Sequence, residues 1–585
     1  MQKNQRTGDP DLTLLLGNQA VARGAWEAGV KVVTSYPGTP STEITESAAQ
    51  YPEINTQWAT NEKVAMEVAF GAAMAGARAM TCMKHVGMNV AADPLFTAAY
   101  TGVNAGFVAV VADDPAMHSS QNEQDSRYYA RAAHLPMLEP ADSSECKEFT
   151  KRAFALSEEL DTPVIVRLTT RIAHARSPVE EAPREEIAVK PYAKDVAKYV
   201  MMPGMAKKRH LVVEEREKKL AEAVNDSPVN VTELRNPEIG VITSGVCYQY
   251  VRDALPEAST LKLGMVYPLP MKKIAAFAKQ VKRLIVIEEL EGLIEKDIKA
   301  AGIACEGKEL TGIQGELDVD RVRCAVLGSQ QACAYAAELP NRPPTLCPGC
   351  PHRGIFHVIS KLKLHVMGDI GCYTLAGLPP LSAMDACLCM GASIGMASGA
   401  ERAQGREFSK KTVAVLGDST FIHSGITGLI DAVYGQEAIT VLILDNRITG
   451  MTGHQQNPAT GLDIHGKPAP MLDLEALCRG CGVQHITVVD PLNLAEVKRV
   501  LEEETQRDAV SVVIARRPCA LIDKTPRTPY HTDGCRNCGA CLKVSCQAIE
   551  RKGDHIEINA SLCTGCGMCA QVCPFGAIVK GDDAQ

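Results

Sequence analysis

Eight cysteines near the end of the chain have the spacing of ligands for iron–sulfur clusters. A first run, C-x2-C-x2-C-x4-C, contains Cys535, Cys538, Cys541 and Cys546. A second run, C-x2-C-x2-C-x3-C followed by proline, contains Cys563, Cys566, Cys569 and Cys573. A C-x2-C-x2-C segment gives three thiolates to one cubane, and the fourth thiolate comes from the other run. The two expected ligand sets are Cys535, Cys538, Cys541 and Cys573 for one 4Fe–4S cluster, and Cys563, Cys566, Cys569 and Cys546 for the other.

The first run departs from the second in two ways. Four residues precede Cys546 instead of three, and Gln547 stands where the second run has Pro574. The extra residue loosens this loop. Zinc is the alternative, but zinc takes four ligands, and eight cysteines in a repeated triplet spacing fit two cubanes better. Two clusters at the end of a long chain indicate a one-electron relay rather than a catalytic centre.

A second set of residues offers oxygen ligands where two apolar strands end. The expected strand 412–416 runs into Asp418, and the expected strand 439–444 runs into Asn446, with a helical stretch at 423–434 between them. A right-handed βαβ crossover brings both strand ends to one edge of the sheet, where ligands bind. Asp418 and Asn446 should therefore converge there. Their oxygens suit a magnesium ion that holds a diphosphate.

The same turn resembles the thiamine diphosphate enzymes, whose motif is G-D-G followed at a similar interval by asparagine. Here the turn is Gly417, Asp418 and Ser419, and 27 residues separate Asp418 from Asn446. Gly417 lets the backbone turn close to phosphates. The resemblance implies that Asp418, Asn446 and the backbone carbonyl of Ile448 hold magnesium. Ser419 stands where that family usually has glycine. A doubly wound domain without a cofactor is the alternative.

Thiamine chemistry also needs a carboxylate beside the aminopyrimidine ring, in a dry site. The segment 60–74, TNEKVAMEVAFGAAM, offers Asn61 as a helix cap and Glu62 in the first helical turn. The resemblance implies that Glu62 is the catalytic carboxylate, with Glu67 as the fallback. The alternative is that Glu62 has only a structural role, as a first-turn glutamate that interacts favourably with the helix dipole.

The segment Tyr36–Thr42, YPGTPST, follows an expected strand. It resembles the Y-P-x-T-P-S loop of the 2-oxoacid:ferredoxin oxidoreductases. The resemblance implies that Thr39 faces the substrate and the thiazolium ring, whereas a rigid proline turn is the structural alternative. A dense polar run at 118–127, HSSQNEQDSR, either lines the substrate pocket or caps the domain surface.

Four further cysteines match positions that bind a proximal 4Fe–4S cluster in these oxidoreductases. The family has a C-P-G-C segment, a later G-C and a cysteine after the last strand. The counterparts here are Cys347, Cys350, Cys372 and Cys519. A buried oxidation site needs a nearby first electron acceptor, so we expect a third cluster on these residues. Two alternatives stay open: zinc on Cys347, Cys350 and His352, and coincidence, because this part of the chain also contains Cys387, Cys389, Cys478 and Cys481.

Several α/β domains are needed to position these residues. The first part of the chain has strand candidates at 31–35, 80–83, 108–112 and 163–168. A charged connector follows, with one solvated helix expected near 214–224. Further strand candidates lie after it, at 240–243, 284–287, 364–367 and 510–515. We expect an α/β, multidomain thiamine-diphosphate fold with a C-terminal bacterial-ferredoxin-like α+β domain. The expected boundaries are 1–180 for a pyrimidine-binding-type domain, 181–236 for the connector, 237–340 for a transketolase-C-like domain, 345–517 for the diphosphate- and magnesium-binding domain, and 525–585 for the two-cluster ferredoxin-like domain.

Composition excludes several classes of protein. The 585 residues are too many for one hydrophobic core. The net charge of −8 argues against nucleic acid as a partner, because binding to phosphates needs a positively charged surface. No apolar run approaches the roughly 18 residues that cross a bilayer, so we expect no membrane partner. The polar N-terminus has no signal-peptide core, and 22 cysteines at short spacings indicate metal ligands in a reducing compartment. We therefore expect a cytoplasmic location.

The whole chain resembles the α subunits of the indolepyruvate ferredoxin oxidoreductases, in the same domain order and over essentially the full length. The resemblance implies oxidative decarboxylation of arylpyruvates (indolepyruvate, phenylpyruvate, 4-hydroxyphenylpyruvate) with coenzyme A to arylacetyl-CoA and CO2, while ferredoxin is reduced. It also implies thiamine diphosphate, Mg²⁺, two or three 4Fe–4S clusters and a small β subunit as partner. The rival hypotheses are a related oxidoreductase with a non-aromatic 2-oxoacid, a non-redox thiamine diphosphate decarboxylase or synthase, and an electron-transfer adaptor without thiamine.

Overall fold

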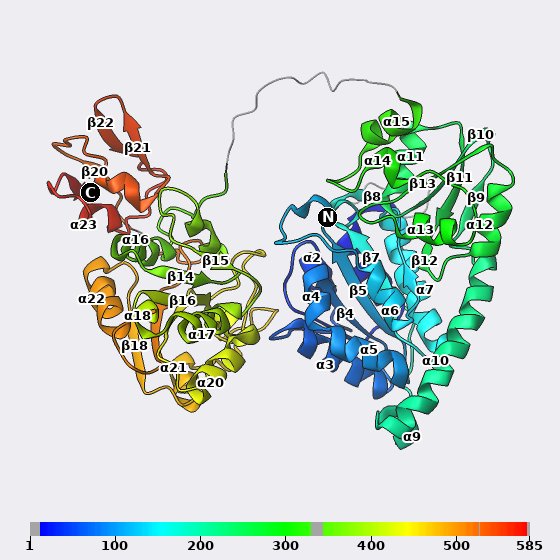
Figure 1. The fold of residues 1–585 in the computed structure, drawn as a ribbon, viewed down its shortest axis with the longest axis horizontal. Helices are drawn as coiled ribbons and strands as arrows, with labels where there is room; N and C mark the ends of the chain where they lie inside the picture. The colour runs from blue at the N-terminus through cyan, green and yellow to red at the C-terminus, as the bar shows by residue number, and fades with distance from the viewer. Residues whose placement is uncertain (1–11, 329–342, 526, 582–585) are drawn as a thin grey trace. The chain divides into compact units, whose positions relative to one another are not determined.

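The computed structural model describes residues 12–328, 343–525 and 527–581. The chain forms two compact units, residues 1–337 and 338–585, which are described separately below (Figure 1). The expected boundaries at residues 1, 340 and 585 lie outside the described residues.

The first unit contains a seven-stranded sheet that is buried on both faces. Among the described residues the strand order is β12-β6-β7-β5-β4-β2-β3, parallel throughout except that β12 runs antiparallel to β6. Val108 and Val110 of β5 pack with helices α1 and α7, whereas Ala109 and Val111 pack with α3 and α5. Burial on both faces explains why these strands are continuous apolar runs in the sequence. The strands are β2 (Val32–Ser35), β3 (Asn55–Trp58), β4 (Ala79–Lys84), β5 (Phe107–Asp113), β6 (Met137–Leu138), β7 (Val164–Thr169) and β12 (Met265–Tyr267). The helices are α1 (Gly17–Glu27), α3 (Glu62–Met74), α5 (Ala92–Thr101) and α7 (Ser143–Leu160).

A four-stranded sheet in the same unit shares the core of the first sheet. Within the described residues its order is β13-β10-β11-β9. Ile242 and Leu261 on one face belong to the same hydrophobic core as Ala109, while Val241 and Ile285 on the other face pack against α11 and α15. The two α/β parts therefore fold as one body. The elements are β9 (Val231–Glu233), β10 (Asn236–Ser244), β11 (Ala258–Leu263), β13 (Arg283–Ile287), α11 (Val246–Ala254) and α15 (Val319–Leu327).

The connector contains a longer and better packed helix than its composition suggests. We expected one solvated helix near 214–224, but α10 spans Pro203–Ala223. Its buried face contains Val213, Arg216 and Leu220. Arg216 donates hydrogen bonds from its guanidinium group to the carbonyl oxygens of Ala99, at 2.9 Å, and of Asp161, at 3.1 Å. Arg216 thus provides part of the packing between α10 and the rest of the first unit, which an apolar stripe on the helix would normally provide.

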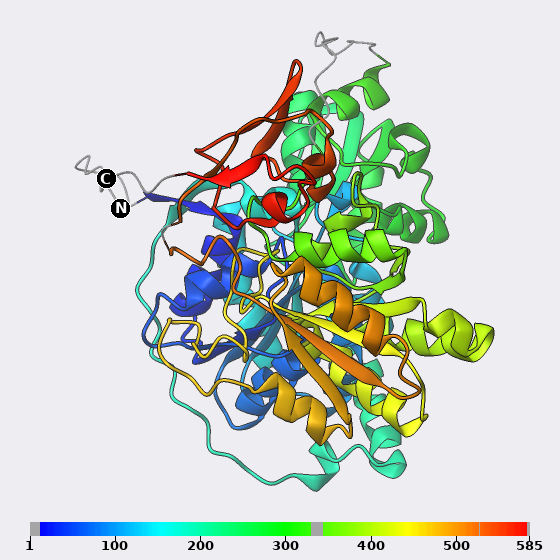
Figure 2. The ribbon, with the colours of Figure 1, turned by 90° about the vertical axis from the view of Figure 1, so that its left-hand side faces the viewer.

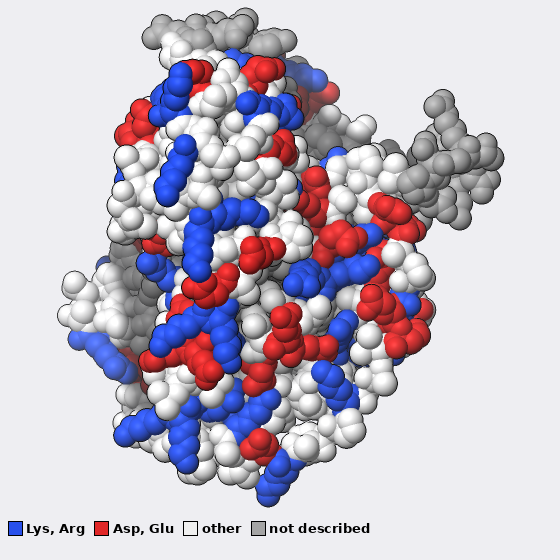
Figure 3. Space-filling model, turned by 90° about the vertical axis from the view of Figure 1, so that its right-hand side faces the viewer, with Lys and Arg blue, Asp and Glu red and all other residues white. Residues whose placement is uncertain are grey.

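Charges of both signs are mixed on the face of the molecule that Figure 3 presents. Lys and Arg side chains lie among Asp and Glu side chains there, and neither sign forms a continuous patch. On α10, for example, Lys219 pairs with Glu215 at 2.8 Å. This face therefore lacks the single-sign field that favours a polyanion.

The second unit is built on a six-stranded parallel sheet (Figure 2). Among the described residues its order is β15-β14-β16-β17-β19-β18. Val415 and Leu442 face the core formed with helices α16 and α22, and Leu416 and Ile443 face the core formed with α17 and α20. The fold is thus doubly wound. The elements are β14 (His365–Gly368), β15 (Ala386–Cys387), β16 (Thr412–Gly417), β17 (Thr440–Asp445), β18 (His485–Val489), β19 (Ser511–Arg516), α16 (His352–Leu362), α17 (Ala392–Gln404), α20 (Ile426–Tyr434) and α22 (Leu494–Glu504).

A small α+β module completes the second unit. Strand β20 (Tyr530–Thr532) pairs antiparallel with β23 (Ile578–Lys580), and β21 (Ile549–Lys552) forms a hairpin with β22 (His555–Ile558). Two short helical segments, η5 (Ala540–Val544) and α23 (Met568–Gln571), lie between these strands in the sequence. The parallel sheets and this module confirm the expected fold class. None of the helices in the described parts of the chain has the length and apolar character needed to cross a bilayer.

Candidate functional site

Three polar groups converge where the parallel strands β16 and β17 end. Asp418 directly follows β16, and Asn446 directly follows β17. One of the two side-chain amide positions of Asn446 lies 3.2 Å from Oδ1 of Asp418 and 2.8 Å from the carbonyl oxygen of Ile448, and the amide nitrogen in that position donates to both. All three residues are buried. The topology thus brings together the three residues that the sequence singled out as magnesium ligands.

The Asn446 amide can serve this site in two ways. With its nitrogen towards Asp418 and Ile448 it donates to both. With its oxygen turned there instead, the three groups would offer oxygen ligands to a cation. The other carboxylate oxygen of Asp418, Oδ2, is buried and has no hydrogen-bond partner among the described residues. Burial, together with the nearby Asp445, raises the pKa of Asp418 to about 7. These features fit a divalent cation that the carboxylate would ligate.

Two residues that our sequence reasoning missed shape the same edge of the sheet. The Tyr373 hydroxyl donates to the carbonyl oxygen of Ile370 at 2.9 Å and accepts from the Gly417 amide at 3.0 Å. Asp369 is buried and accepts from the backbone amide of Gly391 at 2.9 Å. The signal that singled out Asp418, a carboxylate directly after an apolar strand, also applies to Asp369. No local signal identifies Tyr373.

Ser419 contributes its hydroxyl to the same turn. The Ser419 and Thr449 hydroxyl oxygens lie 3.0 Å apart and share a hydrogen bond. Thr449 belongs to the loop after Asn446, so this contact ties the first strand-end turn to the second. Serine in place of the usual glycine is therefore accommodated here through a specific contact.

In the first unit, the structure distinguishes the two candidate carboxylates on helix α3. The helix begins at Glu62, and the Asn61 side chain caps it by accepting from the amide of Val64 at 2.9 Å. Glu62 is 5% exposed, and a side chain at Gly87 would collide with it, since a Cβ atom there would lie 2.6 Å from Oε1 of Glu62. Glu67 is exposed and pairs with Lys63 on the surface. Of the two, only Glu62 lies in a site that excludes water.

Thr39 lies beside a lysine that our sequence reasoning missed. The Ser119 hydroxyl donates to the Thr39 carbonyl oxygen at 3.4 Å, and the Lys84 ammonium donates to the Ser119 carbonyl oxygen at 3.0 Å. Burial lowers the pKa of Lys84, while Asp114 and Glu62 act in the opposite direction. The signal in the sequence is a lysine that directly ends an apolar strand, because β4 ends at Lys84.

The two ends of the polar run 118–127 differ, and the buried end has neither of the two roles we considered. Ser119 is near Thr39, as described above. At the other end, Arg127 is fully buried, and its Nε atom donates to Asp125 at 2.9 Å while its Nη2 donates to the Glu289 carbonyl oxygen at 3.0 Å. This end of the run joins the two α/β parts of the first unit rather than lining a pocket.

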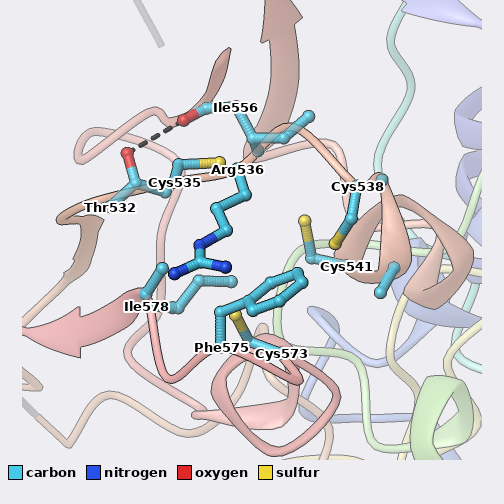
Figure 4. A pocket seen from close by; sticks show the side chains of 12 residues that line it. Thr532, Cys535, Arg536, Cys538, Cys541, Ile556, Cys573, Phe575 and Ile578 are labelled. Carbon is cyan, nitrogen blue, oxygen red and sulfur yellow. Dashed lines mark hydrogen bonds between the residues drawn. The ribbon is translucent and has the colours of Figure 1, made fainter.

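The eight cysteines of the terminal module surround two separate hollows. One hollow has the first set of four in its lining, and Figure 4 draws these residues. A second hollow has the other set of four in its lining. Within the described residues, no three His, Cys, Asp or Glu side chains lie close enough to hold one metal ion directly. The thiols thus surround spaces rather than single points. The first set is Cys535, Cys538, Cys541 and Cys573, and the second is Cys546, Cys563, Cys566 and Cys569.

The four cysteines expected to bind a third cluster also lie near one another. Burial raises the pKa of Cys350 to about 12, and nearby Cys372 and Cys519 add to the effect. Burial likewise raises the pKa of Cys372 to about 11, with contributions from Cys519 and Cys347. The backbone amide of Cys519 donates to the carbonyl oxygen of Asn446 at 3.0 Å. These thiols therefore adjoin the loop that carries the candidate magnesium ligand.

A buried arginine, also missed by our sequence reasoning, lies between this group and the terminal module. Arg353 is 0% exposed, and its Nε donates to the Cys347 carbonyl oxygen at 2.9 Å while Nη1 donates to that of Val544 at 3.4 Å. No carboxylate in the described part of the chain lies within ion-pair distance of it. Burial lowers its pKa, and thiolates at Cys546, Cys350, Cys347 and Cys566 counter that effect. A buried cation needs an anionic partner, which thiolate-ligated clusters would supply.

Family models match the chain in four segments. "Pyruvate flavodoxin/ferredoxin oxidoreductase, thiamine diP-bdg" matches residues 23–235, and "Indolepyruvate oxidoreductase domain" matches 231–320. "Thiamine pyrophosphate enzyme, C-terminal TPP binding domain" matches 369–515, and "4Fe-4S binding domain" matches 556–579. The chain is 40% identical to the indolepyruvate oxidoreductase subunit IorA of Archaeoglobus fulgidus, over 98% of both chains. This chain belongs to the indolepyruvate oxidoreductase family.

A second curated relative agrees with this assignment. The IorA subunit of Pyrococcus horikoshii is 38% identical, over 97% of this chain and 96% of its own. A solved structure of a 2-oxoglutarate:ferredoxin oxidoreductase from Magnetococcus marinus, with 2-oxoglutarate, coenzyme A and succinyl-CoA bound, has a TM-score of 0.47 at 20% identity, over 55% of this chain and 67% of the other. The family membership confirms an oxidoreductase α subunit with thiamine-diphosphate-binding domains and a 4Fe–4S domain.

Proposed function

We propose that the chain catalyses the CoA-dependent oxidative decarboxylation of arylpyruvates, together with a small β subunit. The balanced reaction joins one arylpyruvate and one coenzyme A thiol to give one arylacetyl-CoA, one CO2 and one proton. Two electrons leave, and each reduces one oxidised ferredoxin. Indolepyruvate, phenylpyruvate and 4-hydroxyphenylpyruvate are the substrates we expect. The support for this substrate class is the full-length similarity to subunits named for indolepyruvate.

The residues at the end of the second-unit sheet would hold the cofactor's diphosphate through Mg²⁺. Asp418, Asn446 and the Ile448 carbonyl are the proposed ligands, and the support is that these three groups converge and that Oδ2 of Asp418 is buried without a hydrogen-bond partner among the described residues. Tyr373 fixes the Gly417 amide at the same edge. When bound, thiamine diphosphate supplies a carbon nucleophile and an electron sink for decarboxylation.

In the first unit, Glu62 is the proposed acid–base group, because its burial favours proton exchange with a bound heterocycle over proton exchange with water. Lys84 is the proposed partner of the substrate carboxylate. It is a half-buried ammonium near Thr39, and the carboxylate of a 2-oxoacid would add to the negative charge that Asp114 and Glu62 already place around it. Thr39 then lies beside the bound acid, as the family loop implies.

The cysteine sets are the proposed electron route. The two four-cysteine hollows would hold two 4Fe–4S clusters, and Cys347, Cys350, Cys372 and Cys519 would hold a third. The buried cation Arg353, with thiols of two sets around it, supports a cluster on each side of it. One-electron carriers are needed because ferredoxin accepts a single electron at a time.

The observation that carries the proposal is that the site of Asp418, Asn446 and Ile448 and the two four-cysteine hollows occupy one compact unit. The test is anaerobic purification of the α and β subunits together, followed by iron, sulfide and thiamine analysis. We expect about twelve irons and one thiamine diphosphate per α chain. Brown protein that binds no thiamine would indicate an adaptor, and thiamine binding without iron would indicate a non-redox enzyme. About eight irons would remove the third cluster only.

A further inference from the structure

The two four-cysteine hollows differ in what surrounds them. The hollow that contains Cys546 and Cys566 is also lined by Gly349, from the C-P-G-C segment. A Cβ atom on Gly349 would lie 2.0 Å from the Thr564 hydroxyl oxygen, so the two segments are in direct contact. The hollow that contains Cys538 is lined only by residues between 532 and 578. The hollow with Cys546 and Cys566 thus faces the thiamine-type domain and is the inner hollow. The hollow with Cys538 is the outer hollow.

The outer hollow reaches the surface beside an arginine and a phenylalanine. Cys538 is exposed, and Phe575 keeps 48% of its surface exposed. The guanidinium carbon of Arg536 lies 4.9 Å from the centroid of the Phe575 ring. Figure 4 shows Arg536 reaching towards Phe575, with the four cysteines of this set around the pair. Stacking of this kind holds a cation in place at the surface.

The segments that form the outer and inner hollows contain cations and no carboxylates. Residues 534–549 include Arg536 and Lys543 but no Asp or Glu, and residues 559–581 include Lys580 but no Asp or Glu. Arg551 adds to the outer side, where its guanidinium donates to the Asn537 side chain at 2.6 Å. Asp533 and Glu550 flank the first segment, and residues 527–581 together contain six Lys and Arg against four Asp and Glu. This local excess of positive charge contrasts with the net charge of −8 for the whole protein.

We propose that Arg536 and Phe575 form the docking face for ferredoxin, an acidic iron–sulfur electron carrier, and that electrons leave the enzyme there. This inference rests on the proposed function. A cluster held by the cysteines of the outer hollow would supply one electron to one oxidised carrier at each encounter, so two encounters would follow each 2-oxoacid oxidised. Phe575 supplies a flat apolar contact that excludes water, and Arg536 meets a carboxylate of the partner. Complementary charge of this kind mainly raises the association rate, which falls as salt screens it.

The test uses the complete iron-loaded enzyme with its β subunit, in three variants. Arg536→Glu reverses the docking charge, and Phe575→Ala removes the apolar contact. Arg479→Glu is the matched control, because it makes the same charge change on helix α21 (Leu474–Gly480), which lies at the opposite end of the second unit from the terminal module (Figures 1 and 2). Steady-state rates are measured with ferredoxin and, separately, with methyl viologen, a small acceptor that needs no docking face.

We expect Arg536→Glu to lower kcat/KM for ferredoxin at least tenfold at low salt and to flatten its salt dependence. Phe575→Ala should lower kcat/KM for ferredoxin severalfold, and Arg479→Glu should leave it within twofold of the wild-type value. All three should keep the wild-type iron content and methyl viologen rate. Unchanged ferredoxin kinetics in the first two variants would overturn the docking face. So would an equal loss with both acceptors, or a shifted cluster potential at unchanged KM for ferredoxin. If a variant loses iron, Arg536→Gln and Phe575→Leu replace it. A wild-type enzyme that reduces neither acceptor would instead refute the proposed function.

Discussion

The Nε atom of Arg353, a fully buried side chain of the second unit, lies 2.9 Å from the carbonyl oxygen of Cys347. This contact joins helix α16 to the C-P-G-C segment. Through its contact with Val544, the same guanidinium joins α16 to the terminal module. One buried cation thus lies between two groups of candidate cluster ligands.

Replacing Arg353 by methionine should therefore change the clusters. Reduction adds negative charge, so loss of a nearby buried cation should lower the potentials of the adjacent clusters by roughly tens of millivolts. Arg353→Lys should restore much of the difference, since the charge is kept. Redox titrations followed by electron paramagnetic resonance measure this. Potentials that match the wild type in an iron-replete Arg353→Met enzyme would contradict the proposed role.

Glu62 and Glu67 make a matched pair on one helix. Glu62→Gln should keep thiamine diphosphate bound but lower kcat by roughly 10²- to 10⁴-fold, because an amide cannot exchange the proton. Glu67→Gln removes an exposed carboxylate from a surface pair and should leave kcat within twofold. Turnover numbers and bound thiamine are measured for both variants. Near-normal kcat in Glu62→Gln would move the acid–base role to another residue.

Lys84 should act on substrate binding more than on turnover. Lys84→Met removes a charge-assisted contact, so KM for the arylpyruvate should rise by about 10- to 100-fold with a smaller change in kcat. Lys84→Arg should recover part of the affinity. The neutral methyl ester of the same oxoacid provides the comparison, because its weak binding should not change further in the variant. An unchanged KM for the acid in Lys84→Met would remove this residue from the site.

Glu289 gives the first unit a specific dependence on pH. Burial raises the pKa of Glu289 to about 7. The Leu317 amide, which donates to the carboxylate, and the charge of Lys308 both act to lower this pKa but do not outweigh burial. Because the folded-state pKa lies above the unfolded value, the Glu289 carboxyl contributes fully to the free energy of unfolding below about pH 4.5. This contribution is lost as the pH rises through about 7. Glu289→Gln should therefore be more stable than the wild type at pH 8, by up to about 3 kcal/mol, and nearly equal to it at pH 5. Urea unfolding at both pH values measures this; a difference that does not grow with pH would contradict it.

The sequence could indicate the site residues that follow apolar strands, and the reason is local. Asp418 and Asn446 end adjacent strands of a βαβ unit, and the handedness of that unit brings them together. The cysteine runs are similarly self-contained, because each ligand set comes from two short loops of one module. Their spacing therefore carries most of the geometry.

The rest depends on contacts between distant segments. Arg353 is one of two Arg and Lys residues in helix α16, and its burial arises because Val544, nearly two hundred residues later, packs beside it. Strand β12 is only three residues long and joins a sheet formed by the first part of the chain. Arg216 faces inward on a helix whose charges indicated solvent. No periodicity in the sequence encodes these contacts.

The most direct test of the central claim is ferredoxin reduction by the complete α and β enzyme under anaerobic conditions with coenzyme A. Indolepyruvate, phenylpyruvate and 4-hydroxyphenylpyruvate are compared with pyruvate and 2-oxoglutarate. We predict two ferredoxins reduced for each CO2 and each arylacetyl-CoA formed, with kcat/KM at least tenfold higher for the aromatic acids. A higher kcat/KM for pyruvate or 2-oxoglutarate would contradict the arylpyruvate assignment, and CO2 release without ferredoxin reduction would contradict the redox mechanism.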